Sequence, residues 1–434
     1  MSLRDFLKEE KDIIEFNESF STKYEIPLIM KKYDGGPILI FNNIKDNTSG
    51  IRIITGVCGT RERLLRSINA NKNNYYEKII NAINNPIKPK VEKFNFDIEK
   101  NDISCLPVLT YYEKDPGPYI TSGVVIAKHP IKNFQNSSIH RLLVLDKKRM
   151  AIRIVPRHLY SMYQEAKELG KDLEIAIAIG LHPAVLLGVN TSPKYGIDEL
   201  WIANSLLNGK LRLTKCETVN VEVPIDSEII IEGVIKKDEL VDEGPFVDLT
   251  GCYDIVRKQP VIEINKVVMR KNAFYHAILP GGYEHKLLMG LPKEAKIYDS
   301  ISKIIPEVKG VRLTMGGCCW FHAVISIKKQ AEGDGKNAIL AAFGAHPSLK
   351  HVIVVDDDID IDNMLEVEWA IATRFQGDED LIIIKKARGS SLDPSSDMEK
   401  MTTCKVGIDA TIPWDKPREK FLKAKIPGEN NVLN

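Results

Sequence analysis

The feature of this sequence that most constrains its fold is a series of short apolar segments that runs from about residue 107 to residue 279. In segments such as "YITSGVVIAKH", "SEIIIEGVI", "PVIEINKVVMR" and "AFYHAIL", apolar and polar residues alternate and β-branched residues are frequent. The stretch "LDKK" between "RLLV" and "RMAIRIV" is a natural hairpin turn. The pattern predicts a mainly antiparallel barrel or sandwich, interrupted by helical segments at "HLYSMYQEAKELGKDL" and "GIDELWIANSLLNG".

Mixed helical and strand patterns flank this β-rich block. Before it, "SLRDFLKEEKDIIEF" and "TRERLLRSINA" have a helical period, "PILIFNNI" is typical of a strand, and the polar "NNPIKPKVEKFNFDIEKNDISCLP" predicts a linker. After about residue 290, strand patterns such as "FHAVISIKK" alternate with helical ones such as "NMLEVEWAIATRF". We therefore expect an α/β (α+β) protein with an N-terminal α/β region (1–105), a β-rich domain (106–290), a C-terminal α/β domain (291–415) and a tail (416–434).

The composition excludes several classes of protein. The chain has 434 residues, is 44% hydrophobic and has a formal net charge of +1. This length suggests two or three domains, and the absence of a Lys/Arg tract gives nucleic-acid binding little support. No apolar run is long enough for a membrane span, and the charged N-terminus lacks a signal-peptide core, so we expect a cytoplasmic protein. The seven cysteines form no CxxC pair, which argues against a disulfide framework or a structural zinc site.

The stretch "EGPFVD" places two carboxylates, Glu243 and Asp248, around a Gly-Pro turn. In a buried cleft near a cation, one carboxylate could stay ionised while the other carries a proton. A solvated turn between two strands explains the same spacing. Arg141, at the end of "NSSIHR", is expected at the start of a strand, where it would need a carboxylate partner such as Glu243 or Asp248. An exposed strand end is the alternative.

Three separated residues have the chemistry of a metal site. His158 follows the predicted hairpin, and Glu199 begins a predicted helix, where acidic residues usually cap the helix. Together with Asn136 they would form a mixed oxygen and nitrogen site for Mn²⁺ or Mg²⁺. The spacing is compatible both with helix capping by Glu199 and with a metal site. The acidic "DDDIDIDN" lacks the ligand pattern of an EF-hand, and "EGDGKN" lacks that of a P-loop.

Taken in order, several of these segments resemble the UbiD family of decarboxylases, which use prenylated FMN. The resemblance runs over most of the chain, through "PYITSGVVIAKHP", "NSSIHR", "CETVNVEVPIDSEIIIEGVI", "EGPFVDLTGCY", "GGCCWFHAVISI", "KHVIVVDDDIDI", "GSSLDPSSD" and "KVGIDAT". It implies a central split β-barrel that binds the flavin between N-terminal and C-terminal α/β regions, in a homo-oligomer such as a dimer or hexamer. It also favours a site, rather than a surface turn, at "EGPFVD".

The resemblance implies a role for each candidate residue. Arg141, Glu243 and Asp248 correspond to the catalytic Glu–Arg–acid network, in which the last acid handles the proton and is Glu in some members. Asn136, His158 and Glu199 correspond to residues that hold a divalent metal, typically Mn²⁺, against the flavin phosphate; K⁺ is a further cation to expect. The expected flavin-binding residues are Ile139, His140, Arg141, Arg153, His158 and Lys405.

The activity implied is non-oxidative, reversible decarboxylation of an α,β-unsaturated acid, with a flavin prenyltransferase supplying the cofactor. The Lys/Ile/Asn-rich composition is compatible with an archaeal source, so we expect trans-anhydromevalonate 5-phosphate as substrate and isopentenyl phosphate, an isoprenoid precursor, as product. Lys286, Lys271 and Arg270 are candidate partners for the substrate phosphate. The alternatives are a hydroxybenzoate-type aromatic decarboxylase and a non-catalytic flavin-binding subunit. The joint presence of Arg141, Glu243 and Asp248 argues against the latter.

Overall fold

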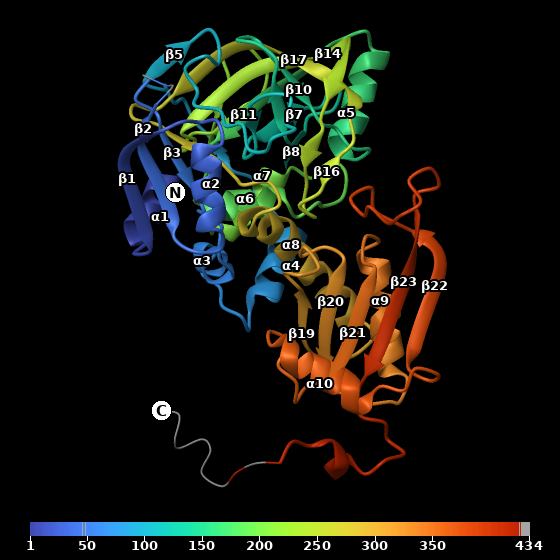
Figure 1. The fold of residues 1–434 in the computed structure, drawn as a ribbon. Helices are drawn as coiled ribbons and strands as arrows, with labels where there is room; N and C mark the ends of the chain where they lie inside the picture. Colours follow the sequence, from blue (N-terminus) through green and yellow to red (C-terminus); the bar gives the residue numbers. More distant parts are fainter. Residues whose placement is uncertain (46, 48, 425, 427–434) are drawn as a thin grey trace. The chain divides into compact units, whose positions relative to one another are not determined.

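The computed structural model describes residues 1–45, 47, 49–424 and 426 (Figure 1). The chain forms two compact units, Met1–Pro292 and Lys293–Asn434. The predicted domain boundaries at residues 105, 290 and 415 stay predictions. Much of the predicted tail lies outside the described residues, and its described part contains a short 3-10 helix, Arg418–Phe421.

The first unit begins with a four-stranded sheet in the order β1-β2-β3-β18. The predicted helix at "SLRDFLKEEKDIIEF" is wrong in its second half, because the helix ends at Glu9 and Ile13 and Ile14 enter a strand that pairs with β2. "AFYHAIL" forms β18, which pairs with β3 of this sheet rather than with the β-rich block. The elements are α1 (Leu3–Glu9), β1 (Ile13–Phe20), α2 (Glu25–Lys32), β2 (Ile38–Ile44), β3 (Arg52–Thr55), α3 (Arg61–Ser67), α4 (Tyr75–Asn84) and β18 (Phe274–His276).

A nine-stranded sheet forms the centre of this unit and confirms the predicted antiparallel architecture. Its order is β6-β9-β10-β17-β14-β11-β7-β8, with β5 paired to β17, and Figure 1 shows it curling into a partial barrel. The two longest strands, β14 and β17, pair with each other in the middle of this order. The segment "LDKK" forms the predicted turn between β9 and β10. The strands are β5 (Ile98–Lys100), β6 (Tyr119–Ile120), β7 (Val124–Lys128), β8 (Gln135–Ile139), β9 (Leu142–Val144), β10 (Arg149–Ile152), β11 (Leu173–Ile179), β14 (Ile229–Glu243) and β17 (Arg257–Met269).

The predicted linker carries structure of its own. Two short strands lie in it: β4 pairs with β12 in a small sheet of order β13-β12-β4, and β5 joins the barrel. Each has only two or three residues, too few for a recognisable period. The small sheet consists of β4 (Lys90–Val91), β12 (Arg212–Lys215) and β13 (Glu222–Pro224). Three further helices of the first unit are α5 (His158–Glu168), α6 (Pro183–Val189) and α7 (Glu199–Leu206).

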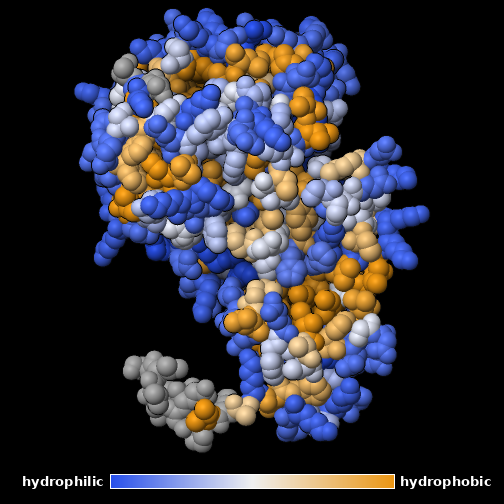
Figure 2. Space-filling view, viewed as in Figure 1, coloured by the Kyte–Doolittle hydropathy of each residue, from blue (hydrophilic) through white to orange (hydrophobic). Residues whose placement is uncertain are grey.

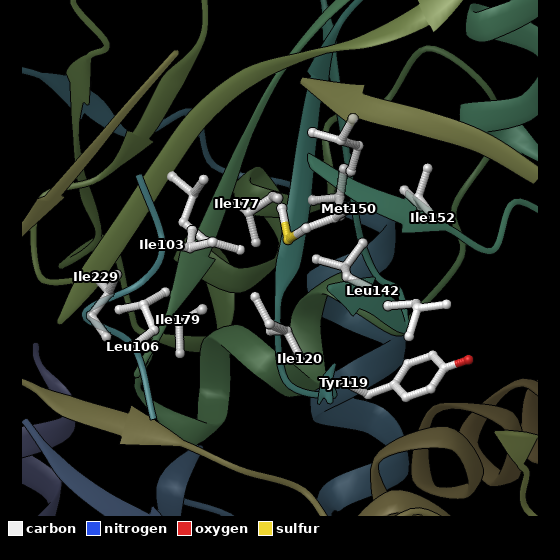
Figure 3. Packing of buried hydrophobic residues seen from close by; sticks show 14 of the residues in the cluster. Ile103, Leu106, Tyr119, Ile120, Leu142, Met150, Ile152, Ile177, Ile179 and Ile229 are labelled. Atoms are coloured by element: carbon white, nitrogen blue, oxygen red, sulfur yellow. The ribbon is translucent and has the colours of Figure 1, made fainter. Parts of the chain in front are cut away.

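The interior of the barrel is filled by aliphatic side chains. Ile120, Met150 and Ile177 are almost completely buried, and Figure 3 shows them pointing toward one another. Burial of each such side chain contributes about 1.5–3 kcal/mol relative to leaving it exposed. This packing fixes the strands whose ends carry the candidate site.

The second unit is an α/β domain with a five-stranded sheet in the order β19-β20-β21-β23-β22. The central strands are parallel, whereas β19 and β22 run antiparallel to their neighbours at the two edges. Its elements are the end of α8 (Tyr283–Ser302), β19 (Val308–Leu313), β20 (His322–Ile327), α9 (Asp334–Ala345), β21 (His351–Asp356), α10 (Met364–Arg374), β22 (Leu381–Arg388) and β23 (Thr402–Ala410). Over the described part of the chain, no helix has both the length and the apolar character that crossing a membrane requires.

Candidate functional site

The centre of the candidate site is a buried ion pair between Arg141 and Glu243. Arg141 immediately precedes β9, as predicted, and only 8% of its side chain is exposed. Glu243 is the last residue of β14 and is fully buried. The Arg141 Nε donates to Glu243 Oε1 over 2.9 Å, and Nη2 donates to Oε2 over 2.8 Å. This two-point contact fixes the orientation of both side chains.

Asp248 and a further acid contact the same guanidinium. A short hairpin, β15 (Phe246–Val247) and β16 (Tyr253–Asp254), follows the Gly-Pro turn. It brings Asp248 Oδ2 within 3.5 Å of Arg141 Nη1 and Asp254 Oδ2 within 3.3 Å of Nη2. Burial alone would raise the pKa of Asp254, but the hydrogen bond from Arg257 and the charge of Arg141 hold it below its ordinary value. Three carboxylates therefore share Arg141.

Two aromatic residues enclose the pair. The Tyr119 hydroxyl donates to Glu243 Oε1 over 3.1 Å, and burial, together with the Glu243 charge, raises the pKa of Tyr119, so the hydroxyl keeps its proton. The Arg141 guanidinium carbon lies 4.9 Å from the centre of the Phe246 ring. A cation over a ring face is stabilised by the ring quadrupole. Tyr119 thus adds a hydrogen bond to the Glu243 carboxylate, and the Phe246 ring covers one face of the Arg141 guanidinium.

His285 on α8 lies beside the loop that carries Asp248. Its Nδ1 accepts a hydrogen bond from the Gly281 backbone N–H over 3.2 Å, which places the ring proton on Nε2. A Cβ atom at Gly281 would lie 3.1 Å from the Asp248 carbonyl oxygen, so this turn and the loop pack directly together. Burial lowers the pKa of His285, and the charge of Asp248 opposes that shift. The site therefore contains a neutral imidazole near the predicted proton donor.

The predicted metal ligands also come together. Glu199, at the start of α7, is 2% exposed, and its Oε1 accepts from Asn136 Nδ2 over 2.8 Å and lies 3.5 Å from His158 Nδ1. The backbone N–H of Ser137 donates to Glu199 Oε2 over 2.8 Å. Asp198 caps α7 through the N–H of Leu200, as helix-start acids usually do. Burial and the charge of Glu199 raise the pKa of Asp198 to about 7.

This donor set fits a divalent cation. A buried carboxylate, an amide oxygen and an imidazole are ligands that Mn²⁺ and Mg²⁺ accept, and a bound cation would neutralise the charge of Glu199. Asn136 would have to turn its oxygen toward the metal, because its nitrogen now donates to Glu199. Among the described residues, no group of three or more His, Cys, Asp and Glu side chains has the arrangement of a metal site, and the set here has two such residues.

Residues predicted to contact the flavin lie close together, since the backbone N–H of Arg153 donates to the carbonyl oxygen of Arg141 over 3.3 Å. Ile139 ends β8, and His140 follows it with Nδ1 2.8 Å from the Arg153 carbonyl oxygen. Burial lowers the pKa of His140 to about 4. Burial, followed by the charges of Arg257 and Arg141, also lowers the pKa of Arg153. Arg141 and Arg257 are paired with carboxylates, so Arg153 is the guanidinium of this group that fits an anion such as a flavin phosphate.

The remaining basic candidates belong to other elements of the chain. Lys405 is on β23 of the second unit, where its ammonium donates to the carbonyl oxygens of Pro347 and Leu349 over 2.6 and 2.5 Å. Arg270 donates to the carbonyl oxygens of Ser227 and Ile225. Lys286, next to His285 on α8, is half-buried. The role of Lys405 in binding the flavin phosphate stays a prediction.

Sequence reasoning missed four residues of the site: Tyr119, Asp254, Arg257 and His285. Asp254 and Arg257 could have been found by pairing the two-residue segments "FV" and "YD" across the turn "DLTGC". His285 reaches the site through the packing of the turn at Gly281, which has no local sequence signal.

Comparisons with known proteins agree with this geometry. Three family models of 3-octaprenyl-4-hydroxybenzoate carboxy-lyase (UbiD) match: the N-terminal domain at residues 4–83, the Rift-related domain at 85–283 and the C-terminal domain at 286–410. Anhydromevalonate phosphate decarboxylase of Methanothermobacter thermautotrophicus is 48% identical over 97% of this chain and 99% of its own.

Two similar solved structures are forms of the UbiD-class enzyme HmfF from Pelotomaculum thermopropionicum. One, in complex with FMN, has a TM-score of 0.96 at 40% identity, covering 100% of this chain and 99% of that one. The other, an evolved dimeric form in complex with prenylated FMN, has a TM-score of 0.90 at 37% identity and covers 99% and 98%. The fold, the matched domains and the level of identity agree along the whole chain, and the protein belongs to the UbiD family of carboxy-lyases.

Proposed function

We propose that this enzyme decarboxylates trans-anhydromevalonate 5-phosphate to isopentenyl phosphate, and that Arg141, Glu243 and Asp248 are its catalytic residues. The observation that carries the catalytic assignment is that one buried guanidinium contacts both acids of "EGPFVD". The substrate assignment is supported by five archaeal relatives, 41–48% identical, that are named anhydromevalonate phosphate decarboxylase.

The three catalytic residues divide the work. Arg141 holds Glu243 through two hydrogen bonds and fixes its position. Asp248 has a single, longer contact with Arg141, and 22% of its side chain is exposed, so it is the carboxyl that can approach the substrate and deliver a proton to the carbon that loses CO₂. We further propose that His285, whose Nδ1 accepts from the Gly281 N–H, donates its Nε2–H to the substrate carboxylate.

Prenylated FMN, when bound, would supply the electron sink that decarboxylation needs. Arg153, with Ile139 and His140, would contact the flavin, and Asn136, Glu199 and His158 would hold Mn²⁺ against its phosphate. The support is the chemistry of the two sites, since a buried carboxylate attracts the cation, and Arg153, whose guanidinium lies near those of Arg257 and Arg141, attracts the phosphate. Lys405 as a phosphate ligand and a bound K⁺ belong to the same proposal.

We further propose the setting in which the enzyme works. A flavin prenyltransferase must supply the cofactor, and we place the enzyme in the cytoplasm as a homo-oligomer. Lys286 is the favoured partner for the substrate phosphate because it lies beside His285, whereas Arg270 is bound to the carbonyl oxygens of Ser227 and Ile225.

A substrate comparison tests the assignment. Protein co-expressed with a flavin prenyltransferase is assayed for CO₂ release with trans-anhydromevalonate 5-phosphate, its unphosphorylated acid and 4-hydroxybenzoate. The proposal predicts the highest kcat/KM for the phosphorylated acid, with a raised KM for that substrate alone in Lys286→Ala. Preferential turnover of 4-hydroxybenzoate would replace it with an aromatic decarboxylase, and flavin binding without turnover of any acid would indicate a non-catalytic subunit.

A further inference from the structure

Three separate segments carry the proposed metal ligands, and one tyrosine, Tyr195, connects them. Asn136 lies on β8, His158 begins α5 and Glu199 begins α7. Tyr195 belongs to the segment between α6 and α7, and it is 39% exposed. Hydrophobic residues reach the surface at several places on both units (Figure 2), so exposure alone does not single out this tyrosine. The contacts of its side chain do.

A tight turn fixes the backbone at Tyr195. The N–H of Ile197 donates to the carbonyl oxygen of Lys194 over 3.2 Å, and Gly196 has a positive φ of 97°. A positive φ at the third residue is typical of a type II turn, in which that position is usually glycine. The segment "KYGI" therefore holds Tyr195 at the second position of a defined turn, shortly before the ligand Glu199.

The ring of Tyr195 packs against the metal ligand His158. The two ring centres are 5.3 Å apart, with an angle of 62° between the ring planes. A second edge-to-face contact, at 5.4 Å, joins Tyr195 to Phe134, which shortly precedes Asn136 on the chain. Aromatic rings favour this arrangement because the positive edge of one ring meets the negative face of the other. The ring of Tyr195 thus ties its own segment to those that carry His158 and Asn136.

The hydroxyl of Tyr195 is held as well. It donates to Glu165 Oε1 over 3.2 Å, and Glu165 lies about two helical turns after His158, on the same face of α5. His129 lies at the other oxygen of this carboxylate. Its Nδ1 accepts from the N–H of Ile131 over 3.1 Å, which places the ring proton on Nε2, and Nε2 lies 3.1 Å from Glu165 Oε2. The Tyr195 ring is therefore oriented by a carboxylate that is itself oriented.

The contact with Tyr195 bears on metal binding because His158 is the most exposed of the three ligands. Its side chain is 27% exposed, whereas Asn136 and Glu199 are almost fully buried and hydrogen-bonded to each other. An imidazole binds a metal well when residues behind it fix the orientation of its ring. The Tyr195 ring is such a residue for His158, whose Nδ1 lies 3.5 Å from Glu199 Oε1.

We propose that Tyr195 is a positioning residue of the metal site: its ring orients the imidazole of His158 relative to Glu199, so that the ligands are arranged before Mn²⁺ binds. The inference rests on the proposed role of Asn136, Glu199 and His158 as metal ligands. It goes beyond that role because Tyr195 is not itself a ligand and acts through His158.

The affinity of the full-length protein for Mn²⁺, measured with FMN in excess, tests the proposal. Electron paramagnetic resonance counts free Mn²⁺, so the measurement requires no turnover. Tyr195→Ala should raise the Kd for Mn²⁺ by about 10–100-fold, the usual effect of losing a group that supports a metal ligand. Tyr195→Phe keeps the ring on His158 and should restore most of the affinity. Tyr160→Ala, at a 38% exposed tyrosine of α5, is the matched control and should bind Mn²⁺ as wild type does. An unchanged Kd in Tyr195→Ala would overturn the proposal.

A double-mutant cycle separates positioning of His158 from a general effect on folding. If Tyr195 acts through His158, Tyr195→Ala should weaken Mn²⁺ binding in the wild-type background and have little further effect in His158→Ala. An equal loss of affinity in both backgrounds would show that Tyr195 stabilises the fold rather than the ligand, and the proposal would be wrong.

Glu199→Gln distinguishes this inference from the metal site itself. If Glu199→Gln binds Mn²⁺ as tightly as wild type, or if wild type binds no Mn²⁺, the assignment of the metal ligands fails and the role of Tyr195 fails with it. If Glu199→Gln loses affinity and Tyr195→Ala does not, the metal site stands and only the role of Tyr195 is contradicted.

Discussion

The Arg141 guanidinium meets Glu243 through two hydrogen bonds of 2.8 and 2.9 Å, whereas it reaches Asp248 through a single contact of 3.5 Å. Glu243 is fully buried, and Asp248 is partly exposed on the loop after β15. In the proposed mechanism, this asymmetry assigns different roles to the two acids of "EGPFVD". Glu243 is the fixed member that positions Arg141, and Asp248 is the member with the freedom to exchange a proton.

Replacing Asp248 by Asn should lower kcat by about 10²–10⁴-fold, the usual contribution of a general acid or base. The amide preserves the shape of the side chain, so the absorbance of bound flavin should not change. Steady-state CO₂ release and the visible spectrum measure the two effects. Asp242→Asn is the matched control, because Asp242 is an exposed acid of the same region that pairs with Lys258. Wild-type turnover in Asp248→Asn would rule out Asp248 as the proton donor.

Replacing Glu243 by Gln should destabilise the protein, because it leaves Arg141 buried without its principal counter-charge. Breaking a buried pair in this way costs about 3–5 kcal/mol, and Asp254 and Asp248 offset part of it. Tyr119→Phe removes one hydrogen bond to the same carboxylate and should cost only about 1 kcal/mol. The free energy of unfolding from urea titrations measures both. Equal losses in the two variants would contradict the central position of the ion pair.

The buried acid Asp198 predicts a specific pH dependence of stability. Burial and the charge of Glu199 raise the pKa of Asp198 to about 7 in the folded protein. The folded state therefore binds more protons than the unfolded state between the ordinary Asp value and pH 7, and this group's contribution to stability is lost as the pH rises through that window. Asp198→Asn keeps the helix cap without the charge.

In metal-free protein, Asp198→Asn should therefore be more stable than wild type at pH 8 and gain less, or nothing, at pH 5. The difference between the two pH values should exceed about 1.4 kcal/mol, the equivalent of one pKa unit. Urea unfolding at both pH values measures it, with Asp242→Asn as the exposed control. A gain independent of pH would show that Asp198 is already ionised throughout this range.

Metal removal should weaken flavin binding if Asn136, Glu199 and His158 hold a cation against the flavin phosphate. Dialysis against a chelator should lower the fraction of bound flavin, and Mn²⁺ should restore it. Glu199→Gln should reproduce the loss and resist restoration by Mn²⁺, whereas Glu168→Gln, an exposed acid of α5, should behave as wild type. If the chelator leaves the fraction of bound flavin unchanged, a cation at these residues does not contribute to flavin binding.

Long, regular segments of the fold could be predicted from the sequence, and short or distant contacts could not. The alternation in "SEIIIEGVI" and "PVIEINKVVMR" predicts β14 and β17 because each strand has more than ten residues with one face toward the core. The strands β4 and β5 are too short to show a period, and their pairing partners are more than a hundred residues away.

The same contrast holds for the site. Arg141 and Glu243 are predictable because each lies at the end of a strand in a recognisable segment, and a buried charge requires a partner. His285 joins them through the turn at Gly281, and Asp254 through a hairpin whose two strands have two residues each. The contact of His285 depends on tertiary packing, which no short stretch of sequence encodes, whereas the hairpin of Asp254 is local and gives only the weak signal of two two-residue strands.

The most direct test of the account compares two preparations of the wild-type protein, expressed with and without a flavin prenyltransferase. Each is characterised by the mass and visible spectrum of its bound ligand, then by CO₂ release from trans-anhydromevalonate 5-phosphate. The account predicts prenylated FMN, CO₂ and isopentenyl phosphate from the first preparation, and no CO₂ from the second. Equal CO₂ release from both, or a first preparation that binds prenylated FMN and leaves the substrate intact, would contradict it.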